Sequence, residues 1–174
     1  MIVDTQLKLS TVNYQLSTKL FMERTLIIIK PGAIRRDLIG ELIHRFERKG
    51  LQLSGIKMIQ LDDKILDEHY SHLVGRPYFQ RIKNSMMKTP VVVCCWKGID
   101  SVHIAHVMAG PTNGREAPQG TIRGDYSVSM QENIIHTSDS VENAKIEIAR
   151  FFKPEEIFEF DQLSSSVLYA NDEY

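Results

Sequence analysis

The chain has 174 residues, a length that fits one domain with a substantial buried core. Hydrophobic residues make up 43% of it and charged residues 25%, which is typical of a globular protein. The formal net charge of -1 excludes a general basic surface for nucleic acid or anionic lipid, so a polyanion site has to be built locally from a few cations. No stretch of the sequence is long and apolar enough to span a membrane.

The first half of the chain predicts two strands and three helices. Residues 25–29 form a β-branched run that is typical of a buried strand. From 34 to 49 apolar residues recur at helical spacing and Gly50 provides a stop, which predicts one helix. A second strand is expected over 51–61, followed by helices over 63–73 and 79–87.

The second half contains the clearest strand, residues 91–96, and a helix over 101–108. A long loop follows from 110 to 130, and loops of this length in compact domains are usually functional. A short strand end at 133–136 and a helix over 141–152 complete the pattern. This order fits an α+β, ferredoxin-like split βαβ sandwich with added helices, although periodicity alone leaves other α/β topologies open.

Cys94 and Cys95 are the only cysteines, and they are adjacent within the predicted strand 91–96. Neighbouring residues of a strand point to opposite faces, which disfavours a disulfide between them. Two free, buried thiols are typical of a reducing compartment, so we expect a cytoplasmic protein.

His136 is the most informative single residue. It follows an apolar pair and precedes Thr137, Ser138 and Asp139, which are residues that cap helices. This context predicts an imidazole presented at a strand-to-helix junction, where it can act as a nucleophile. A histidine beside a helix cap is, taken alone, more often structural, so its interpretation depends on the rest of the sequence.

Two further segments accompany His136, namely residues 26–31 and the glycine-flanked residues 120–125. In this order and spacing the three segments resemble the nucleoside diphosphate kinase family. The resemblance extends from about Met22 to Tyr169 and includes the segments 45–50, 68–70, 76–79 and 110–113. It implies that the sheet is four-stranded and antiparallel.

The resemblance also divides the chain into a kinase domain over 22–174 and an N-terminal extension over 1–21. The extension lacks the continuous apolar core of a signal peptide, because Asp4 and Lys8 interrupt it. We expect it to be weakly ordered, with no function that the sequence reveals.

The resemblance implies ping-pong transfer of the γ-phosphate of ATP, through a phosphohistidine at His136, to a nucleoside diphosphate. Glu147, about three helical turns further on, is implied to hydrogen-bond the distal ring nitrogen. Lys30 is implied to lie near the γ-phosphate and the ribose 3′-hydroxyl, with Asn133 as the other sugar partner. Arg123 can present a guanidinium fork to phosphate oxygens.

The remaining implied site residues surround the nucleotide. Tyr78 corresponds to an aromatic residue that stacks on the base, and Met130 to the opposite wall. Tyr70 is implied to lie near the transferred phosphate and Thr112 to offer it a hydroxyl. Mg²⁺ would be held mostly by the nucleotide's phosphates, with Asp139 reaching it through water.

One departure from the family pattern concerns charge. His106 stands where the family has a second phosphate-clamping arginine, and an imidazole gives one donor where a guanidinium gives a charged fork. We therefore expect reduced phosphate stabilisation. The same residue supports an alternative, a weakly active family member that serves as a nucleotide-binding or scaffold protein.

A second alternative is a metal site on His69 and His72, or on His103 and His106, each pair spaced to share a helix face. No cysteine pair or carboxylate triad completes either pair. The expected partners are ATP and other nucleoside di- and triphosphates, with no membrane and no specific nucleic acid. A homo-hexamer or homo-tetramer is implied, and residues 168–169 resemble the longer tail of hexameric members.

Overall fold

The computed structural model describes residues 22–162 and 165–170 of the chain. The expectation for residues 1–21 therefore lies outside the described residues. Within the described part, no helix combines the length and the apolar character needed to cross a membrane.

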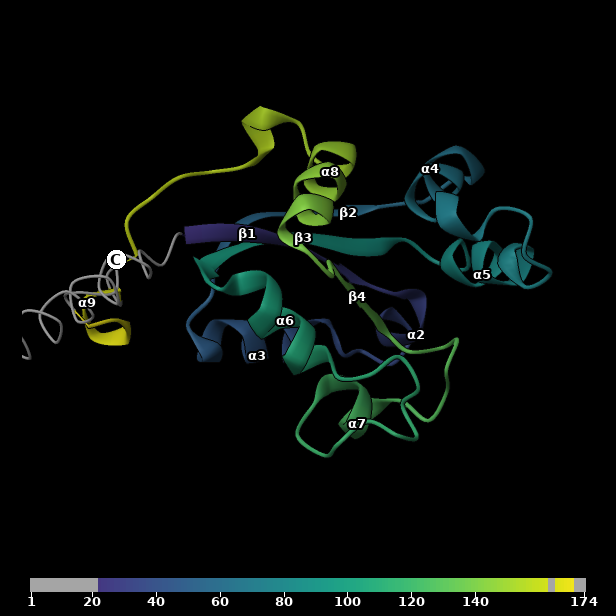
Figure 1. The fold of residues 1–174 in the computed structure, drawn as a ribbon, viewed down its shortest axis with the longest axis horizontal. Coiled ribbons are helices and arrows are strands. Elements are labelled where there is room, and N and C mark those ends of the chain that lie inside the picture. Colours follow the sequence, from purple (N-terminus) through teal and green to yellow (C-terminus); the bar gives the residue numbers. More distant parts are fainter. Residues whose placement is uncertain (1–21, 163–164, 171–174) are drawn as a thin grey trace, which may run out of the picture.

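A four-stranded sheet forms the centre of the domain (Figure 1). The strand order is β2-β3-β1-β4, and the three neighbouring pairs are all antiparallel. The strands are β1 (Met22–Ile29), β2 (Gln52–Ile59), β3 (Val91–Ile99) and β4 (Ile135–Thr137). The predicted ferredoxin-like α+β class and the antiparallel sheet are confirmed.

Alternate residues of β1 face two separate cores, because the side chains of a strand have a period of two. Ile27 and Ile29 belong to the core that contains residues of α3 (Ile39–Lys49) and α6 (Ser101–Ala109). Leu26 and Ile28 belong to the core on the other face. Figure 1 shows α3 and α6 on one face of the sheet and α8 on the other. Burial on both faces explains why β1 and β3 read as continuous apolar runs.

The second core joins β1 and β3 to α4 (Asp63–His69), α5 (Phe79–Met86) and α8 (Val141–Phe151). The two cysteines separate between the two cores, with Cys94 in the first and Cys95 in the second. Both are free and buried, as the alternation of the strand predicted.

The helix predicted over 34–49 is two helices. α2 (Pro31–Ile34) begins at the proline, and the chain then turns through Asp37, whose φ of 57° is left-handed, before α3 starts. The helical spacing continues across this break because both helices direct apolar residues into the same core. Gly50 ends α3 with a φ of 99°, as predicted.

Other boundaries also differ from the predictions. The helix predicted over 63–73 is α4 followed by a 3₁₀ turn, η1 (Ser71–Leu73), and the long loop contains α7 (Ile122–Tyr126), which Thr121 caps by accepting from Gly124 N. After α8 come η2 (Pro154–Glu156) and α9 (Ser165–Leu168).

Helices α4 and α5 extend beyond one end of the sheet as a hairpin (Figure 1). Lys83 of α5 joins them, since its Nζ lies 2.6 Å from Asp63 Oδ1 and 2.7 Å from Asp67 Oδ1. The chain between the two helices carries two of the predicted site residues, Tyr70 and Tyr78.

Substitution of Gly124 tests how tightly the loop around α7 is packed. A Cβ there would overlap the backbone carbonyl group of Pro118 and lie 2.9 Å from Ala117 O, and backbone atoms cannot rotate away. We expect Gly124→Ala to lower the free energy of unfolding by about 1–3 kcal/mol. Gly40→Ala is the matched control, because a Cβ there meets nothing within 4 Å and should stabilise α3 by about 0.5–1 kcal/mol. Equal stabilities of the two variants in urea denaturation would contradict the close approach.

Candidate active site

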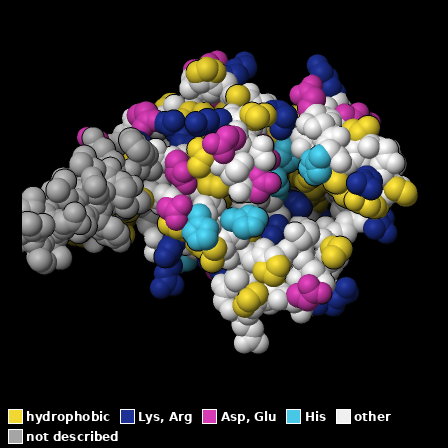
Figure 2. Space-filling model, viewed as in Figure 1, with side chains coloured by type: hydrophobic (Ala, Val, Ile, Leu, Met, Phe, Trp, Pro, Cys, Tyr) yellow, Lys and Arg dark blue, Asp and Glu magenta, His cyan; other side chains and the backbone are white. Residues whose placement is uncertain are grey.

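Two adjoining cavities, of about 640 and 460 Å³, lie between the α4–α5 hairpin, α8 and the loop around α7. They share five lining residues and so form one cleft: Tyr70, His72, Thr112, Arg123 and His136. Figure 2 shows a hollow on this face of the molecule, with histidine, lysine and arginine side chains gathered beside it.

Every residue that the sequence analysis proposed for the site lines this cleft. The larger cavity is also lined by His106, Asp139 and Glu147. The smaller cavity is also lined by Lys30, Tyr78, Met130 and Asn133. Residues from α6, β4, α8, the hairpin, the loop 110–130 and the position just after β1 are thus brought to one place.

His136 lies in the middle of β4, opposite Ile28 of β1. Its Nε2 is 3.0 Å from Oε1 of Glu147, and the other carboxylate oxygen of Glu147 accepts a 2.5 Å hydrogen bond from Ser138 Oγ. Burial alone would raise the pKa of Glu147, but the hydrogen bonds from His136 and Ser138 outweigh it and the pKa is lowered. The ionised carboxylate therefore accepts a hydrogen bond from Nε2–H, which leaves Nδ1 as the nitrogen with a free lone pair.

Lys30 follows β1, and its Nζ donates a 2.7 Å hydrogen bond to Asn133 Oδ1. Asn133 in turn donates from Nδ2 to Met130 O, which orients its side chain. Part of Lys30 remains accessible, but the amine is closely surrounded by protein. Desolvation, with a contribution from the charge of Arg123, lowers the pKa of Lys30 to about 7, while Glu132 opposes the shift.

Arg123 is buried, and three of its N–H groups donate to backbone carbonyls. The acceptors are Gly110 O, Asn133 O and Ile135 O, at 2.5, 3.4 and 2.8 Å. A guanidinium has five N–H groups, so two remain for a ligand. Arg123 therefore fixes the loop to β4 as well as lining the cleft, a second role that the sequence did not reveal.

Ile134 is a strained residue beside the site. Its φ of 59° is left-handed, which is unusual for a β-branched side chain and costs on the order of 1–3 kcal/mol. Its side chain is buried in the core and its carbonyl accepts from Lys30 N at 2.9 Å. The turn lets Asn133 line the cleft while Ile134 packs beneath it.

The other predicted residues differ in exposure. Tyr70 is buried, and desolvation together with Glu147 raises the pKa of its phenol, so it remains a hydrogen-bond donor. Tyr78 and Met130 are exposed at the cleft. His106 is also exposed, with Nδ1 3.4 Å from Thr137 Oγ1, and Asp139 accepts a 2.7 Å hydrogen bond from Asn143.

His69 is a neighbour of His136 that the sequence analysis did not place there. Its ring lies edge-on to those of His136 and Tyr70, with both centroids 4.6 Å away. The structure groups His69 with His136 and Glu147, whose possible ligand atoms lie within 4.8 Å of one another, and not with His72 as the sequence spacing suggested. Only the fold reveals this grouping, because His69 and His136 are far apart in the chain.

Comparison with known proteins identifies the family of the chain that forms this cleft. The sequence model of the nucleoside diphosphate kinase family matches residues 23–157. The chain belongs to the nucleoside diphosphate kinase family. The enzyme from Parabacteroides distasonis is 58% identical over 153 residues, covering 88% of this chain and all of that protein. The enzyme from Pyrococcus furiosus is 47% identical, covering 80% of this chain and 88% of that protein.

Solved structures of the same family also resemble this fold. A nucleoside diphosphate kinase from Halobacterium salinarum, in complex with CDP, matches with a TM-score of 0.84 and 34% identity, covering 86% of this chain and all of that one. The enzyme from Encephalitozoon cuniculi matches with a TM-score of 0.81 and 43% identity, covering 84% of this chain and 99% of that one. The protein is thus a phosphotransferase that acts on nucleotides, as the sequence resemblance implied.

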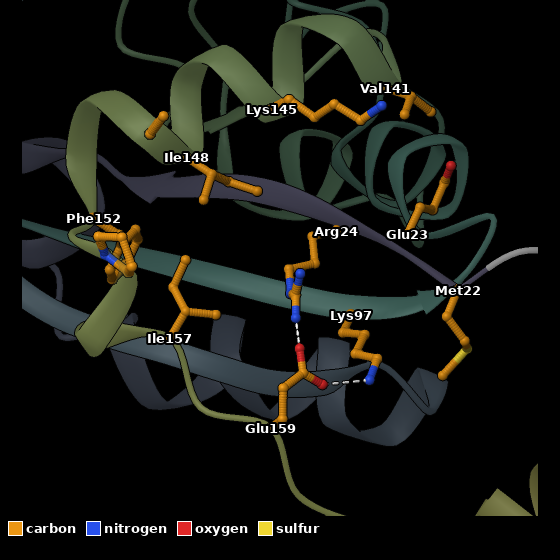
Figure 3. Close-up of a pocket in the computed structure, with 12 residues that line it drawn as sticks. Met22, Glu23, Arg24, Lys97, Val141, Lys145, Ile148, Phe152, Ile157 and Glu159 are labelled. Carbon is orange, nitrogen blue, oxygen red and sulfur yellow. Dashed lines mark hydrogen bonds and ion pairs between the residues drawn. The ribbon is translucent and has the colours of Figure 1, made fainter.

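A larger cavity of this nucleoside diphosphate kinase, about 970 Å³, lies beside α8 and the start of β1 (Figure 3). Arg24 and Lys97 both pair with Glu159 there, so these two charges are already satisfied within the protein. None of the predicted site residues lines it. Size alone therefore does not identify the active site of this family member.

The lowered pKa of Lys30 has a consequence for stability. Between the folded pKa, about 7, and the value of 10.5 for an ordinary lysine, the unfolded chain binds more protons than the folded one. The free energy of unfolding of the kinase should therefore rise with pH relative to that of Lys30→Met, by at most about 1.4 kcal/mol per pH unit. Urea denaturation at pH 7, 8 and 9 measures this difference, with Lys64→Met as the control for removing an exposed lysine. A difference that stays constant or falls with pH would contradict a deprotonated Lys30.

Proposed function

We propose that this nucleoside diphosphate kinase works through a phosphohistidine on Nδ1 of His136. The observation that carries the proposal is the 3.0 Å contact between Nε2 of His136 and Glu147, which commits one ring nitrogen and frees the other. Nδ1 forms a bond to the γ-phosphorus of ATP as the bond to the bridging oxygen of ADP breaks. A β-phosphate oxygen of a second nucleoside diphosphate then takes the phosphoryl group and restores the free imidazole.

Two basic side chains that share the cleft with His136 support this assignment. Lys30 and Arg123 line the cleft with it, and a polyphosphate beside Lys30 would favour the protonated amine. Glu147 compensates the positive charge that the ring carries when Nδ1 is phosphorylated and Nε2 keeps its proton. Tyr70, as a neutral phenol, can donate to the transferred phosphate, and Thr112 offers a hydroxyl in the same cleft.

The base and the metal complete the proposal. Tyr78 and Met130 form walls that can stack on a base without reading its edge, which suits broad use of nucleoside di- and triphosphates. The family uses a divalent metal, and we assign it as Mg²⁺ held mostly by the phosphates, whose charge it would neutralise. Asp139 fits an indirect role: it is exposed beside the cleft, and its hydrogen bond from Asn143 lowers the pKa of its carboxyl.

Assembly and location are further parts of the proposal. A homo-oligomer is expected, with a hexamer favoured over a tetramer because of the tail at 168–169. In the described structure Ile99 N lies 3.5 Å from Tyr169 Oη, so this tail returns to the end of β3. A cytoplasmic location is consistent with two free, buried cysteines.

Formation of the phosphoenzyme tests the mechanism directly. Incubation with γ-labelled ATP and Mg²⁺ should give a label that is acid-labile, alkali-stable and discharged by GDP. His136→Ala should abolish it, whereas His103→Ala, an exposed histidine of α6 outside the cleft, should not. Nucleotide binding without a label at His136 would instead favour the nucleotide-binding or scaffold role, for which His106 is the specific observation.

His106→Arg tests the missing charge. Because the residue lines the same cavity as His136, a guanidinium there should raise kcat/KM by roughly 10-fold or more, corresponding to about 1.5–3 kcal/mol for a charge-assisted contact. His103→Arg, one turn earlier on α6, adds the same charge away from the cleft and is the matched control. If both variants leave steady-state kinetics unchanged, the loss of the arginine is not limiting.

A further inference from the structure

Arg150 presents a difficulty for the proposed site. It follows Glu147 by three residues on α8, so the two side chains are neighbours on one helix face. A guanidinium readily forms a two-pronged contact with a carboxylate, and such a contact would withdraw Glu147 from His136. The structure shows no such ion pair, and Glu147 keeps its contact with His136 Nε2.

Arg150 is directed to two other groups instead. Its Nη1 lies 3.4 Å from Nδ1 of His69, and its Nε lies 4.0 Å from Oε2 of Glu68. His69 and Glu68 are neighbours at the end of α4, so this arginine connects α8 to the α4–α5 hairpin. His69 Nδ1 is itself 3.8 Å from Glu147 Oε1, which places His69 beside both members of the pair that does not form.

This geometry fixes the protonation state of His69. A guanidinium only donates, so Nδ1 must accept from Arg150 and the ring proton lies on Nε2. The side chain is 1% exposed, and Nε2 has no hydrogen-bond partner among the residues that the structure describes. Desolvation is the main cause that lowers the pKa of His69 to about 3, helped by the charges of His136, Arg150 and Lys30 and opposed by Glu147. His69 is therefore a neutral acceptor at working pH.

The ring of His69 is also held in place. Aromatic rings surround it edge-on, with centroid distances of 4.6 Å to Tyr70, 4.6 Å to His136 and 5.2 Å to Phe151. This packing keeps Nδ1 directed at Arg150. A metal ion on His69, His136 and Glu147 is the competing interpretation, but the guanidinium beside Nδ1 occupies that lone pair and repels a cation.

We propose that His69 is a positioning residue that holds Arg150 away from Glu147 and so reserves this carboxylate for the nucleophile His136. The inference rests on the proposed phosphohistidine mechanism. It predicts that removal of the acceptor at His69 slows phosphorylation of His136 because Arg150 then pairs with Glu147. Removal of Arg150 as well should therefore restore the rate.

Single-turnover phosphorylation of His136 by ATP, measured on the full chain, is the readout. His69→Phe keeps a ring but removes the acceptor, and should slow phosphorylation by roughly 10- to 100-fold, the cost of losing one charge-assisted contact. Adding Arg150→Met to this variant should restore the rate to within about 3-fold of the wild type. His69→Asn, which keeps an acceptor near the position of Nδ1, should lose less than His69→Phe.

Lys145→Met is the matched control, since it removes an exposed cation of α8 that does not line the cleft. It should not rescue His69→Phe. A merely structural role of His69 would give a slow enzyme that neither substitution rescues, and that outcome, like an unchanged rate in His69→Phe, would overturn the inference.

A second variant and the phosphorylation of the wild type keep the inference testable if His69→Phe does not fold. If thermal unfolding shows that His69→Phe does not fold, Glu68→Gln replaces it, because it releases the other end of Arg150 from an exposed position. Its rate should fall by about 3-fold and recover with Arg150→Met, and no fall would overturn the inference. Failure of the wild type to form phosphohistidine would refute the proposed function itself, which is a different result from a phosphorylated wild type without rescue.

Discussion

The pairing of β1 with β4 is the contact on which the site depends. β4 has only three residues, and its register with β1 sets His136 opposite Ile28, two residues before Lys30. So short a strand has few ladder hydrogen bonds of its own. Arg123 supplements them by donating to Asn133 O, just before β4, to Ile135 O, at its first residue, and to Gly110 O, so one buried guanidinium joins the loop to the strand that carries the nucleophile.

The cleft concentrates positive groups, and the structure limits the resulting repulsion by lowering charge where burial is greatest. The pKa of Lys30 falls to about 7 and that of His69 to about 3, with desolvation the main cause in each. The left-handed Ile134 adds backbone strain at the same place. These features lower stability and are maintained by the two apolar cores that the central strands share.

Much of the fold could be predicted from the sequence, because β1 and β3 carry the continuous apolar runs, and α8 the periodic apolar residues, that their environments require. The break at Asp37 could not, since the apolar spacing runs across it into one core. The helix α7 could not be predicted either, because it is only five residues long. It depends on the cap of Thr121 and on close approach to residues 117–118.

The site itself could be predicted only through the family resemblance. Taken alone, His136 fits a structural residue beside a helix cap, and nothing in the local sequence connects it to Lys30, 106 positions earlier. The role of Arg123 in bonding three carbonyls, and the place of His69 between Arg150 and Glu147, depend on contacts between distant segments. No periodicity or local motif records such contacts.

The ion pairs of Lys83 with Asp63 and Asp67 have a mechanical consequence. By joining α5 to α4 they couple the two helices of the hairpin, which has His69 at the end of α4, Tyr70 directly after it and Tyr78 directly before α5. In the proposed function, a base that displaces Tyr78 would therefore also act on the groups beside the nucleophile. The base end and the phosphate end of the proposed nucleotide site would then be coupled through the hairpin. A fragment that fills only one of these ends would not position the hairpin as a whole nucleotide does.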